Sequence, residues 1–345
     1  MKTIQVQASK SYDVIIGKGL LKSLGKQLLT LNKQPCKVAI ISDSTVWALY
    51  GKNTADSLIS SGFCVLSFQF PAGENSKNAE TYLDILNFLA ENKITRSDIL
   101  VALGGGVVGD ITGYAAATYL RGVDFVQIPT TLLAMVDSSV GGKTAINLPA
   151  GKNLVGAFHQ PSLVLCDLDT LNTLPDAIFR DGCAEVIKYG VIYDAGLFGH
   201  LSEKGLAFDR EHVISRCVAL KRDVVQQDEF DTGARQMLNF GHTIGHGIEA
   251  QSGFSVTHGQ AVAIGMAIVA KAGCPAIYKQ ITDVLQKFQL PATTEFTAQQ
   301  LYTSALSDKK RAGGTVNLIV PTAIGSCSIV PTDVDALKSF IEEGL

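Results

Sequence analysis

The sequence has no apolar run that could cross a membrane, because none reaches the roughly eighteen uninterrupted apolar residues that a spanning helix needs. The first residues, MKTIQVQASKSYDVIIG, alternate apolar and polar side chains, so we expect a strand there and no signal peptide. The seven cysteines are scattered, odd in number and without a CxxC pair. This distribution argues against a disulfide scaffold or a cysteine-based zinc site, and it predicts a reducing, cytoplasmic location.

The sequence also lacks an excess of either charge. The formal net charge is −3 over 345 residues, which gives no reason to expect nucleic acid or a membrane surface as a partner. Hydrophobic residues make up 46% and charged residues 18%, a balance typical of globular rather than disordered chains. There is no internal repeat and no low-complexity linker. The length is sufficient for two domains, each with its own core.

The first half of the chain alternates short β-branched runs with helical patterns. Strands are expected at 37–43, 64–70, 98–106 and 124–131, and helices at 78–92 and 108–119. Such alternation predicts a largely parallel sheet covered by helices.

The pattern becomes helical after about residue 175. Helices are expected at 176–192, 210–228, 234–250, 256–272, 276–288, 298–307 and 333–343, with a strand pair at 316–331. We therefore predict an α/β, Rossmann-like domain over 1–174 and a mainly α-helical domain over 175–345.

A glycine loop, LGGGVVGD, follows one expected strand and precedes an expected helix. Glycines there let backbone N–H groups approach a phosphate, although a tight strand-to-helix turn explains them equally well and the spacing is not GxGxxG. Polar residues also follow three other expected strands. Taken singly, each of these polar clusters is more typical of a turn or a helix cap. Because the carboxyl ends of parallel strands share one edge, the clusters together favour a bound nucleotide. The residues concerned are Asp43, Glu74, Lys77, Thr130 and Thr131.

Histidines gather in the second half of the chain. NFGHTIGHGIE contains His242 and His246, and His258 follows. Histidines four residues apart share a helical face and can reach one metal ion, or they can be two unrelated packing residues. CAEVIKYG supplies Glu185, which would complete a catalytic zinc site of two histidines and one carboxylate. A simple ion pair with Lys188 is the plainer alternative for that glutamate.

Two further segments carry polar side chains without an obvious structural reason. MVDSSVGGKTAINLPAGKNLVG (135–156) is too polar for a core and too apolar at its edges for a free linker. It is either a solvated surface loop or a loop that converges on an anionic substrate through Asp137, Lys143, Lys152 and Asn153. A helix over 234–250 would place its polar residues in one continuous stripe, spaced four, three and four residues apart. Such a stripe is either solvated or the wall of a cleft. Its members are Arg235, Asn239, His242 and His246.

These motifs together resemble the 3-dehydroquinate synthases, sugar-phosphate cyclases that share their architecture with glycerol dehydrogenase-like and iron-type alcohol dehydrogenases. The resemblance runs in order through GENSK, GGGVVGD, IPTTLLAMVDSSVGGKT, GKN, TLNTLP, EVIKYG, NFGHTIGHGIE, HGQAVAIGM and DKKR. It implies an N-terminal domain that binds NAD, a helical domain that carries a metal, a substrate in the cleft between them, and a homodimer.

The resemblance also implies roles for individual residues. The metal would be Zn²⁺, with Co²⁺ as a substitute, and its ligands would be Glu185, His242 and His258. The NAD contacts would be Asp43, Glu74, Lys77, Gly105, Gly106, Gly109, Asp110, Thr130, Thr131, Lys143, Thr170 and Thr173. The substrate contacts would be Asp137, Lys152, Asn153, Lys188, Lys221, Arg235, Asn239, His246 and one of Lys309 and Lys310. Arg121 would reach the phosphate site of a partner subunit.

The implied activity converts 3-deoxy-D-arabino-heptulosonate 7-phosphate into 3-dehydroquinate and phosphate, the second step of the shikimate pathway to chorismate and the aromatic amino acids. Its steps are oxidation by NAD, phosphate elimination, re-reduction, ring opening and aldol cyclisation. Another sugar-phosphate cyclase is one alternative, but Arg235, Asn239 and Lys221 suit a carboxylate, which those substrates lack. A glycerol dehydrogenase-like oxidoreductase is a second alternative. The lysine-containing GGKT and GKN loops argue against it, because they suit a phosphate and glycerol has none. A non-catalytic protein with the same fold is disfavoured because the set of site residues is complete.

Overall fold

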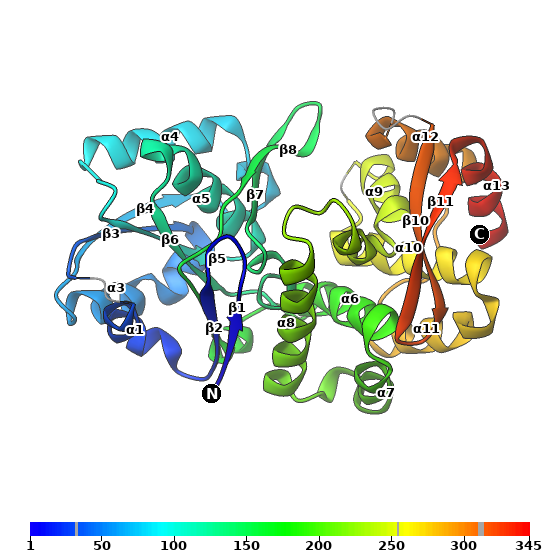
Figure 1. Cartoon of the computed structure of the whole chain (residues 1–345), viewed down its shortest axis with the longest axis horizontal. Coiled ribbons are helices and arrows are strands. Elements are labelled where there is room, and N and C mark those ends of the chain that lie inside the picture. Colours follow the sequence, from blue (N-terminus) through cyan, green and yellow to red (C-terminus); the bar gives the residue numbers. More distant parts are fainter. Residues whose placement is uncertain (32–33, 254, 310–313) are drawn as a thin grey trace. The chain divides into compact units, whose positions relative to one another are not determined.

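The chain divides into two compact units, and Figure 1 labels the longer helices and most strands. The computed structural model describes residues 1–31, 34–253, 255–309 and 314–345, without the side chains of 305–309. Unit 1 comprises Met1–Leu174 and Lys221–Phe230, and unit 2 comprises Pro175–Leu220 and Asp231–Leu345. The sequence pattern places 221–230 in the second domain, whereas in the structure these residues pack with the first.

Unit 1 is built on a seven-stranded sheet in the order β1-β2-β9-β6-β5-β3-β4. Its strands are β1 (Lys2–Val6), β2 (Tyr12–Gly17), β3 (Lys37–Asp43), β4 (Cys64–Phe70), β5 (Ile99–Gly104), β6 (Asp124–Pro129) and β9 (Leu163–Asp167). Within this sheet, as far as the structure describes it, β1 and β2 pair antiparallel and the other neighbouring strands pair parallel. The single strand expected at the N-terminus is therefore a hairpin. The run β4-β3-β5-β6-β9 follows the doubly wound order 2-1-3-4-5, which puts the topological switch point between β3 and β5.

Helices cover both faces of this sheet. In β3, Val38 and Ile40 join a core cluster with α1 (Leu24–Thr30) and α3 (Lys52–Ile59). The alternate residues Ala39 and Ile41 join the opposite cluster with α4 (Ala79–Glu91) and α5 (Gly106–Thr118). A strand buried on both faces needs the nearly continuous apolar run that KVAIISD provides. The shorter elements of this unit are η1 (Leu20–Ser23), α2 (Ser44–Val46), η2 (Trp47–Gly51), η3 (Glu74–Ser76), η4 (Tyr119–Arg121), η5 (Ala134–Ser138) and η6 (Leu168–Asn172).

A two-stranded sheet occupies most of the segment expected to be a loop. Its strands are β7 (Lys143–Leu148) and β8 (Gly151–Phe158), paired antiparallel. The expectation of a loop is therefore wrong for this part of 135–156. Thr144, Ala145 and Ile146 of β7 are buried, and a Cβ on Gly113 of α5 would lie 2.4 Å from the Thr144 side chain. The missing side chain on α5 thus makes room for the hairpin, a tertiary effect that local polarity does not reveal.

Unit 2 is mainly helical, as predicted. Its longer elements are α6 (Asp176–Tyr193), α7 (Ala195–Lys204), the first part of α8 (Arg210–Gln227), α9 (His242–Gln251), α10 (His258–Gly273), α11 (Pro275–Lys287), α12 (Ala298–Lys309), β10 (Thr315–Ala323), β11 (Ser326–Asp333) and α13 (Val334–Gly344). Helix α10 is buried almost all round, as its run of apolar residues requires. Within the described ranges, no helix is both long and apolar enough to span a membrane.

The helix expected over 234–250 is interrupted. A short 3-10 element, η8 (Ala234–Asn239), ends before Gly241, and α9 begins after it. Gly241 has a φ of 78°, a left-handed conformation that glycine adopts without strain. A side chain there would also lie 2.7 Å from the carbonyl oxygen of Val262. The expectation of one continuous helical stripe is therefore wrong, because the polar residues before and after Gly241 belong to different elements.

Candidate active site

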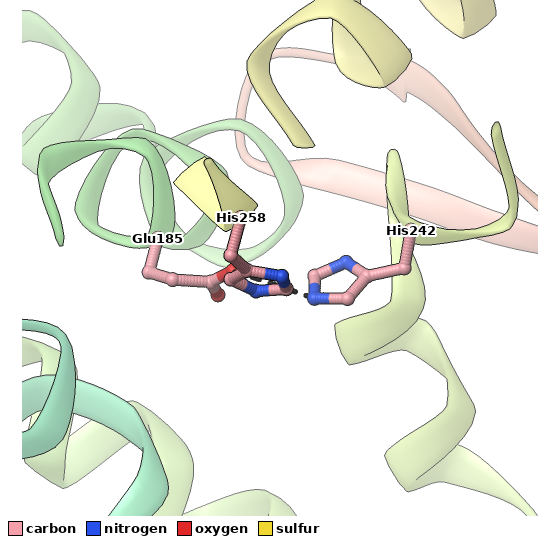
Figure 2. A group of neighbouring side chains, drawn as sticks. All are labelled: Glu185, His242 and His258. Atoms are coloured by element: carbon pink, nitrogen blue, oxygen red, sulfur yellow. Dashed lines mark ion pairs between the residues drawn. The ribbon is translucent and has the colours of Figure 1, made fainter. Parts of the chain in front are cut away.

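Three side chains of unit 2 point toward one another in Figure 2. Glu185 lies within α6, and His242 and His258 are the first residues of α9 and α10. The Nε2 atoms of His242 and His258 lie 3.3 and 3.4 Å from Oε1 of Glu185. One potential ligand atom from each residue lies within 4.8 Å of the others. Two imidazoles and one carboxylate are the ligand set of zinc centres that keep open positions for water or substrate.

Close helix packing creates this convergence. A Cβ on Gly265 of α10 would lie 2.0 Å from the carbonyl oxygen of Gly241, so only glycine permits this approach. The start of α10 is also fixed to α6. Asp181 accepts hydrogen bonds from the Thr257 hydroxyl and, at 3.2 Å, from the backbone N–H of Gln260. Asp181 lies one turn before the glutamate of the site, so these contacts set α10 beside it.

Glu185 carries a negative charge in the protein interior. Its side chain is fully buried, and neither carboxylate oxygen has a hydrogen bond of regular geometry from the described residues. Oε2 forms an ion pair with Lys188. Burial alone would raise the pKa of Glu185, but the charge of Lys188 and the neighbouring rings of His242 and His258 outweigh it and hold the pKa well below its usual value. A buried, ionised and incompletely hydrogen-bonded carboxylate suits a bound cation, so the residues fit a metal ion.

The two histidines differ in basicity. Burial and the charge of Lys188 lower the pKa of His242 to about 4, against the pull of Glu185. Burial also opposes a charge on His258, but its polar contacts with Glu185 and Glu249 and their negative charges outweigh it and raise the pKa to about 10. His242 is therefore neutral at pH 7 and His258 is protonated. Because a metal binds the neutral imidazole, metal binding at His258 would release a proton.

Glu249 is a member of the cluster that the sequence patterns do not single out. Its Oε2 accepts a hydrogen bond of 3.3 Å from Nδ1 of His258, and the residue is buried. With His246 and His258 it forms a second group of potential ligand atoms. Glu249 follows His246 by three residues in NFGHTIGHGIE, a spacing that places both on one helical face. That spacing is the signal from which it could have been predicted.

His246 lies close to the other two histidines. Its ring centroid is 5.6 Å from that of His242 and 6.3 Å from that of His258. Its side chain is exposed, whereas His242 is only 12% exposed. A role in substrate binding rather than in metal binding stays a prediction for His246.

Several of the residues predicted to contact NAD lie at one edge of the sheet in unit 1. Strands β3, β4, β5 and β6 are parallel, so their carboxyl ends share that edge. Gly105 is the residue before the first turn of α5, and the loop therefore opens a helix, where an anion is favoured. The predicted residues at or just after these strand ends are Asp43, Glu74, Lys77, Gly105, Gly106, Thr130 and Thr131.

Several of these residues also have structural hydrogen bonds. Asp43 accepts bonds of 2.9 Å from the backbone N–H groups of Thr45 and Val46, so it caps the following helix. The hydroxyl of Tyr50 contacts Thr173 and donates to the carbonyl oxygen of Thr170 at 3.2 Å. In contrast, the hydroxyl oxygen of Thr130 is buried and has no hydrogen-bond partner among the described residues. Such a group is available to a ligand.

Lys77 lies at the centre of a polar network in unit 1. It forms an ion pair with Asp110 and donates a hydrogen bond of 2.5 Å to Oδ1 of Asn153. Asn147, which the sequence motifs do not single out, accepts from the backbone N–H of Asn153 at 2.9 Å and donates to Glu74 at 2.7 Å. Burial raises the pKa of Asp110 despite the neighbouring lysine. The network joins the turn after β4, helix α5 and the β7–β8 hairpin, and it brings four of the predicted site residues together.

Lys221 and Asp137 form a second buried pair in unit 1. The ammonium of Lys221 contacts the Asp137 carboxylate and donates a hydrogen bond of 2.6 Å to its carbonyl oxygen. Lys221 is 6% exposed. The pairing lies at the first residue of the α8 segment that belongs to unit 1, and it joins two predicted substrate contacts.

The remaining predicted residues have varied environments and keep their roles as predictions. Arg235 is buried, whereas Asn239, Lys143 and Arg121 are exposed and Lys152 is partly buried. Gly109 faces Gln127, because a Cβ there would lie 2.7 Å from its side chain. Lys310 and the side chain of Lys309 lie outside the described part of the chain.

Comparisons with known proteins identify the family. Two family models match successive parts of the chain: the 3-dehydroquinate synthase N-terminal model over 67–181 and the corresponding C-terminal model over 182–311. The chain is 43% identical to the 3-dehydroquinate synthase of Enterococcus faecalis over 353 residues, which covers 99% of this chain and 98% of the relative. The chain belongs to the 3-dehydroquinate synthase family. The 3-dehydroquinate synthase of Microcystis aeruginosa is 45% identical, with 97% of each chain covered. The predicted family is confirmed.

Solved structures agree with this assignment to the 3-dehydroquinate synthase fold. A 2-deoxy-scyllo-inosose synthase with carbaglucose-6-phosphate, NAD⁺ and Co²⁺ bound gives a TM-score of 0.87 at 25% identity, covering 100% of both chains. The 2-epi-5-epi-valiolone synthase of Streptomyces hygroscopicus, with NAD⁺ and Zn²⁺ bound, gives 0.87 at 28% identity, covering 99% of both. The glycerol dehydrogenase of Schizosaccharomyces pombe, at 16% identity and a TM-score of 0.68, covers 99% of this chain and 91% of its own and shares the fold alone. The predicted fold class is confirmed.

Proposed function

We propose that the protein is a phosphate-eliminating lyase that converts 3-deoxy-D-arabino-heptulosonate 7-phosphate into 3-dehydroquinate and phosphate, with NAD and Zn²⁺ as cofactors. One observation carries the proposal. A buried, ionised Glu185 faces His242 and His258 in a chain that matches the 3-dehydroquinate synthases over nearly its whole length.

Glu185, His242 and His258 would hold the metal. Their ligand atoms converge, Glu185 is charged, and the Nδ1 atom of each histidine already has a hydrogen-bond acceptor, namely the carbonyl oxygen of Phe240 and the carboxylate of Glu249. Zn²⁺ or Co²⁺ fits this donor set. When bound, the metal would supply a Lewis acid that lowers the pKa of a coordinated substrate hydroxyl.

The carboxyl edge of the unit 1 sheet would bind NAD. The backbone N–H groups of Gly105 and Gly106 at the start of α5 would receive the pyrophosphate, and the buried hydroxyl of Thr130 would donate to the cofactor. When bound, NAD would supply a hydride acceptor that is regenerated within each turnover. The same edge contains the switch point of the sheet, where open α/β folds bind ligands.

The substrate carries a carboxylate and a phosphate, and the chain offers buried cations to hold them. Lys188, Lys221 and Arg235 are buried, so a charge-assisted hydrogen bond from any of them would be little screened by solvent. Phosphate elimination breaks the C–O bond to phosphate as a proton leaves the adjacent carbon. We assign the holding of that phosphate to Lys152, Asn153, Lys188, His246 and one of Lys309 and Lys310.

A cytoplasmic homodimer completes the proposal. The seven cysteines are free, which suits a reducing compartment. Arg121 is exposed at the end of η4, where it would be available to a second copy. Light scattering measures the oligomeric state. An Arg121→Ala variant that stays dimeric but loses turnover would support a role across the dimer, and full activity would exclude one.

One assay tests the activity. Purified protein is incubated with the heptulosonate phosphate, Zn²⁺ and a small amount of NAD. Release of phosphate in excess of the NAD, without accumulation of NADH, is the expected result. NADH formed one for one from a polyol would instead indicate a glycerol dehydrogenase-like oxidoreductase. Phosphate released only from a sugar phosphate that lacks a carboxylate would indicate another cyclase.

A further inference from the structure

We propose that Glu249 is a positioning residue for the metal centre, which holds the ring of His258 so that its Nε2 atom faces Glu185 and His242. The inference rests on the metal site of the proposed function. Nδ1 of His258 lies 3.3 Å from Oε2 of Glu249, while Nε2 of the same ring lies 3.4 Å from Oε1 of Glu185. The two nitrogens of one imidazole are therefore directed at two different carboxylates.

The hydrogen bond selects the tautomer of His258. A carboxylate accepts and does not donate at neutral pH, so the Nδ1 atom beside Glu249 carries a proton. In the neutral ring the lone pair is then on Nε2, the atom that faces the proposed ligands. A carboxylate that accepts a hydrogen bond from a metal-binding histidine fixes the orientation of the imidazole ring. It also makes the other ring nitrogen a stronger ligand for the metal.

The orientation of the His258 ring depends more on its contact with Glu249 than the orientation of the His242 ring depends on its contact with Phe240. The backbone of His258 is well fixed, because Thr257 and Gln260 form a capping box around the first turn of α10. Its side chain, however, is 33% exposed, against 12% for His242, so packing restricts its ring less. Nδ1 of His242 is directed at the backbone carbonyl of Phe240, 3.1 Å away, which no side-chain substitution removes.

The position of Glu249 on α9 joins the two histidines. It lies about two helical turns after His242, so one face of α9 carries a proposed ligand at its start and the orienting carboxylate further along. Glu249 is 4% exposed, and a buried carboxylate is costly unless it is paired. The same helix therefore supplies one ligand and sets the direction of another.

Zinc affinity of the full-length protein, measured by competition with a chromophoric chelator, tests the proposal. Glu249→Ala removes the acceptor and should weaken Zn²⁺ binding by about 10- to 100-fold. Glu249→Gln retains the size and an amide oxygen that accepts from Nδ1, so it should recover part of that loss. The absorption spectrum of the Co²⁺-loaded protein should change with Glu249→Ala, because the geometry at His258 changes. Gln251→Ala, at an exposed position of the same helix, is the matched control and should leave both readouts unchanged.

The outcomes separate this inference from the proposed metal site. If His242→Ala binds Zn²⁺ as well as the unchanged protein, the metal site itself is wrong. If His242→Ala loses Zn²⁺ while folded Glu249→Ala keeps the original affinity and Co²⁺ spectrum, the positioning role is wrong. Two metal ions per chain, with one lost in Glu249→Ala, would make Glu249 a direct ligand within the His246, Glu249 and His258 group and would also overturn the proposal. Circular dichroism of the metal-free variants shows whether each is folded.

Discussion

Lys188 forms a buried ion pair with Glu185 one turn earlier on α6, so a single carboxylate faces an ammonium on one side and two imidazoles on the other. The sequence alone leaves two alternatives for Glu185, an ion pair with Lys188 or a role as a metal ligand. In the structure the two oxygens of Glu185 divide between them, because Oε2 faces Lys188 and Oε1 faces the histidines. The lysine therefore keeps the carboxylate ionised before a metal binds.

Lys188→Ala should destabilise the metal-free protein by about 3 kcal/mol, because it leaves the charge of Glu185 buried without its nearest cation. Added Zn²⁺ should restore more stability to this variant than to the unchanged protein, since the metal would replace the missing charge. Urea unfolding with and without Zn²⁺ measures both effects. Lys279→Ala removes an exposed lysine that pairs with Asp283 and should change the free energy of unfolding little. Equal protection of both proteins by Zn²⁺ would contradict the argument.

His246→Ala should retain Zn²⁺ but lose turnover by about 100-fold, the size of effect typical of a lost proton-transfer or positioning group. His242→Ala should lose metal and activity together, because its Nε2 lies beside Glu185. Elemental analysis of the purified variants, combined with the phosphate-release assay, distinguishes the two roles. Loss of zinc from His246→Ala would instead place this residue among the ligands.

Gly265→Ala should destabilise unit 2 by about 3 kcal/mol, because the added Cβ would overlap the backbone of Gly241 and force α9 and α10 apart. The same displacement should weaken Zn²⁺ binding, since His242 follows Gly241 directly. Gly199→Ala is a matched control on α7, where a Cβ would meet no atom within 4 Å. That change should be neutral or should stabilise the helix by about 0.5–1 kcal/mol. Thermal unfolding and chelator competition report the two effects, and a stable, zinc-binding Gly265→Ala would refute the packing argument.

Asp194→Ala should destabilise the protein by about 1–2 kcal/mol at pH 7, because Asp194 caps α7 through the backbone N–H of Leu197 and pairs with Arg216. Burial would raise the pKa of Asp194, but the hydrogen bonds from Leu197 and Arg216 outweigh it and lower the pKa below its usual value. Because the pKa of Asp194 is lower in the folded than in the unfolded protein, its carboxylate stabilises the fold fully at pH values above the unfolded-state pKa. This stabilisation is lost as the pH falls through the folded-state pKa. The difference in urea midpoint between the two proteins should therefore shrink between about pH 5 and pH 3. A difference that stays constant over this interval would show that the carboxylate charge does not contribute.

Much of the architecture follows from local pattern. β3, whose sequence KVAIISD is apolar on both faces, has the predicted bounds, and the strand–helix alternation gives the parallel sheet. The convergence of Glu185 with His242 and His258 also agrees with the ligand set that the family resemblance implies. The strand bounds are predictable because they depend on residue type and spacing within one segment. The ligand set joins three helices, so it is predictable only through the ordered family motifs.

The features that were not predicted depend on contacts between distant segments. The β7–β8 hairpin looks like a polar loop because its burial depends on a missing side chain at Gly113. The break before α9 follows from the approach of α10 to Gly241, which the 4, 3, 4 spacing of the polar residues conceals. Glu249 shares a helical face with His246, but that spacing does not reveal its partner, His258, which belongs to another helix. Asn147 was not predicted for the same reason, since its bond to Glu74 spans 73 residues.

The return of α8 to unit 1 has a consequence for biosynthesis. Unit 1 is not a continuous stretch of chain, because Lys221–Phe230 belongs to it and follows the first segments of unit 2. During translation, Asp137 cannot acquire its buried partner until the ribosome has added 84 further residues. A fragment that stops at Leu174 would lack this pair and the contacts of Glu229 with Ser9 and Gln160. The nascent chain must therefore keep its first unit incomplete while it makes α6 and α7, so the two units cannot mature strictly one after the other.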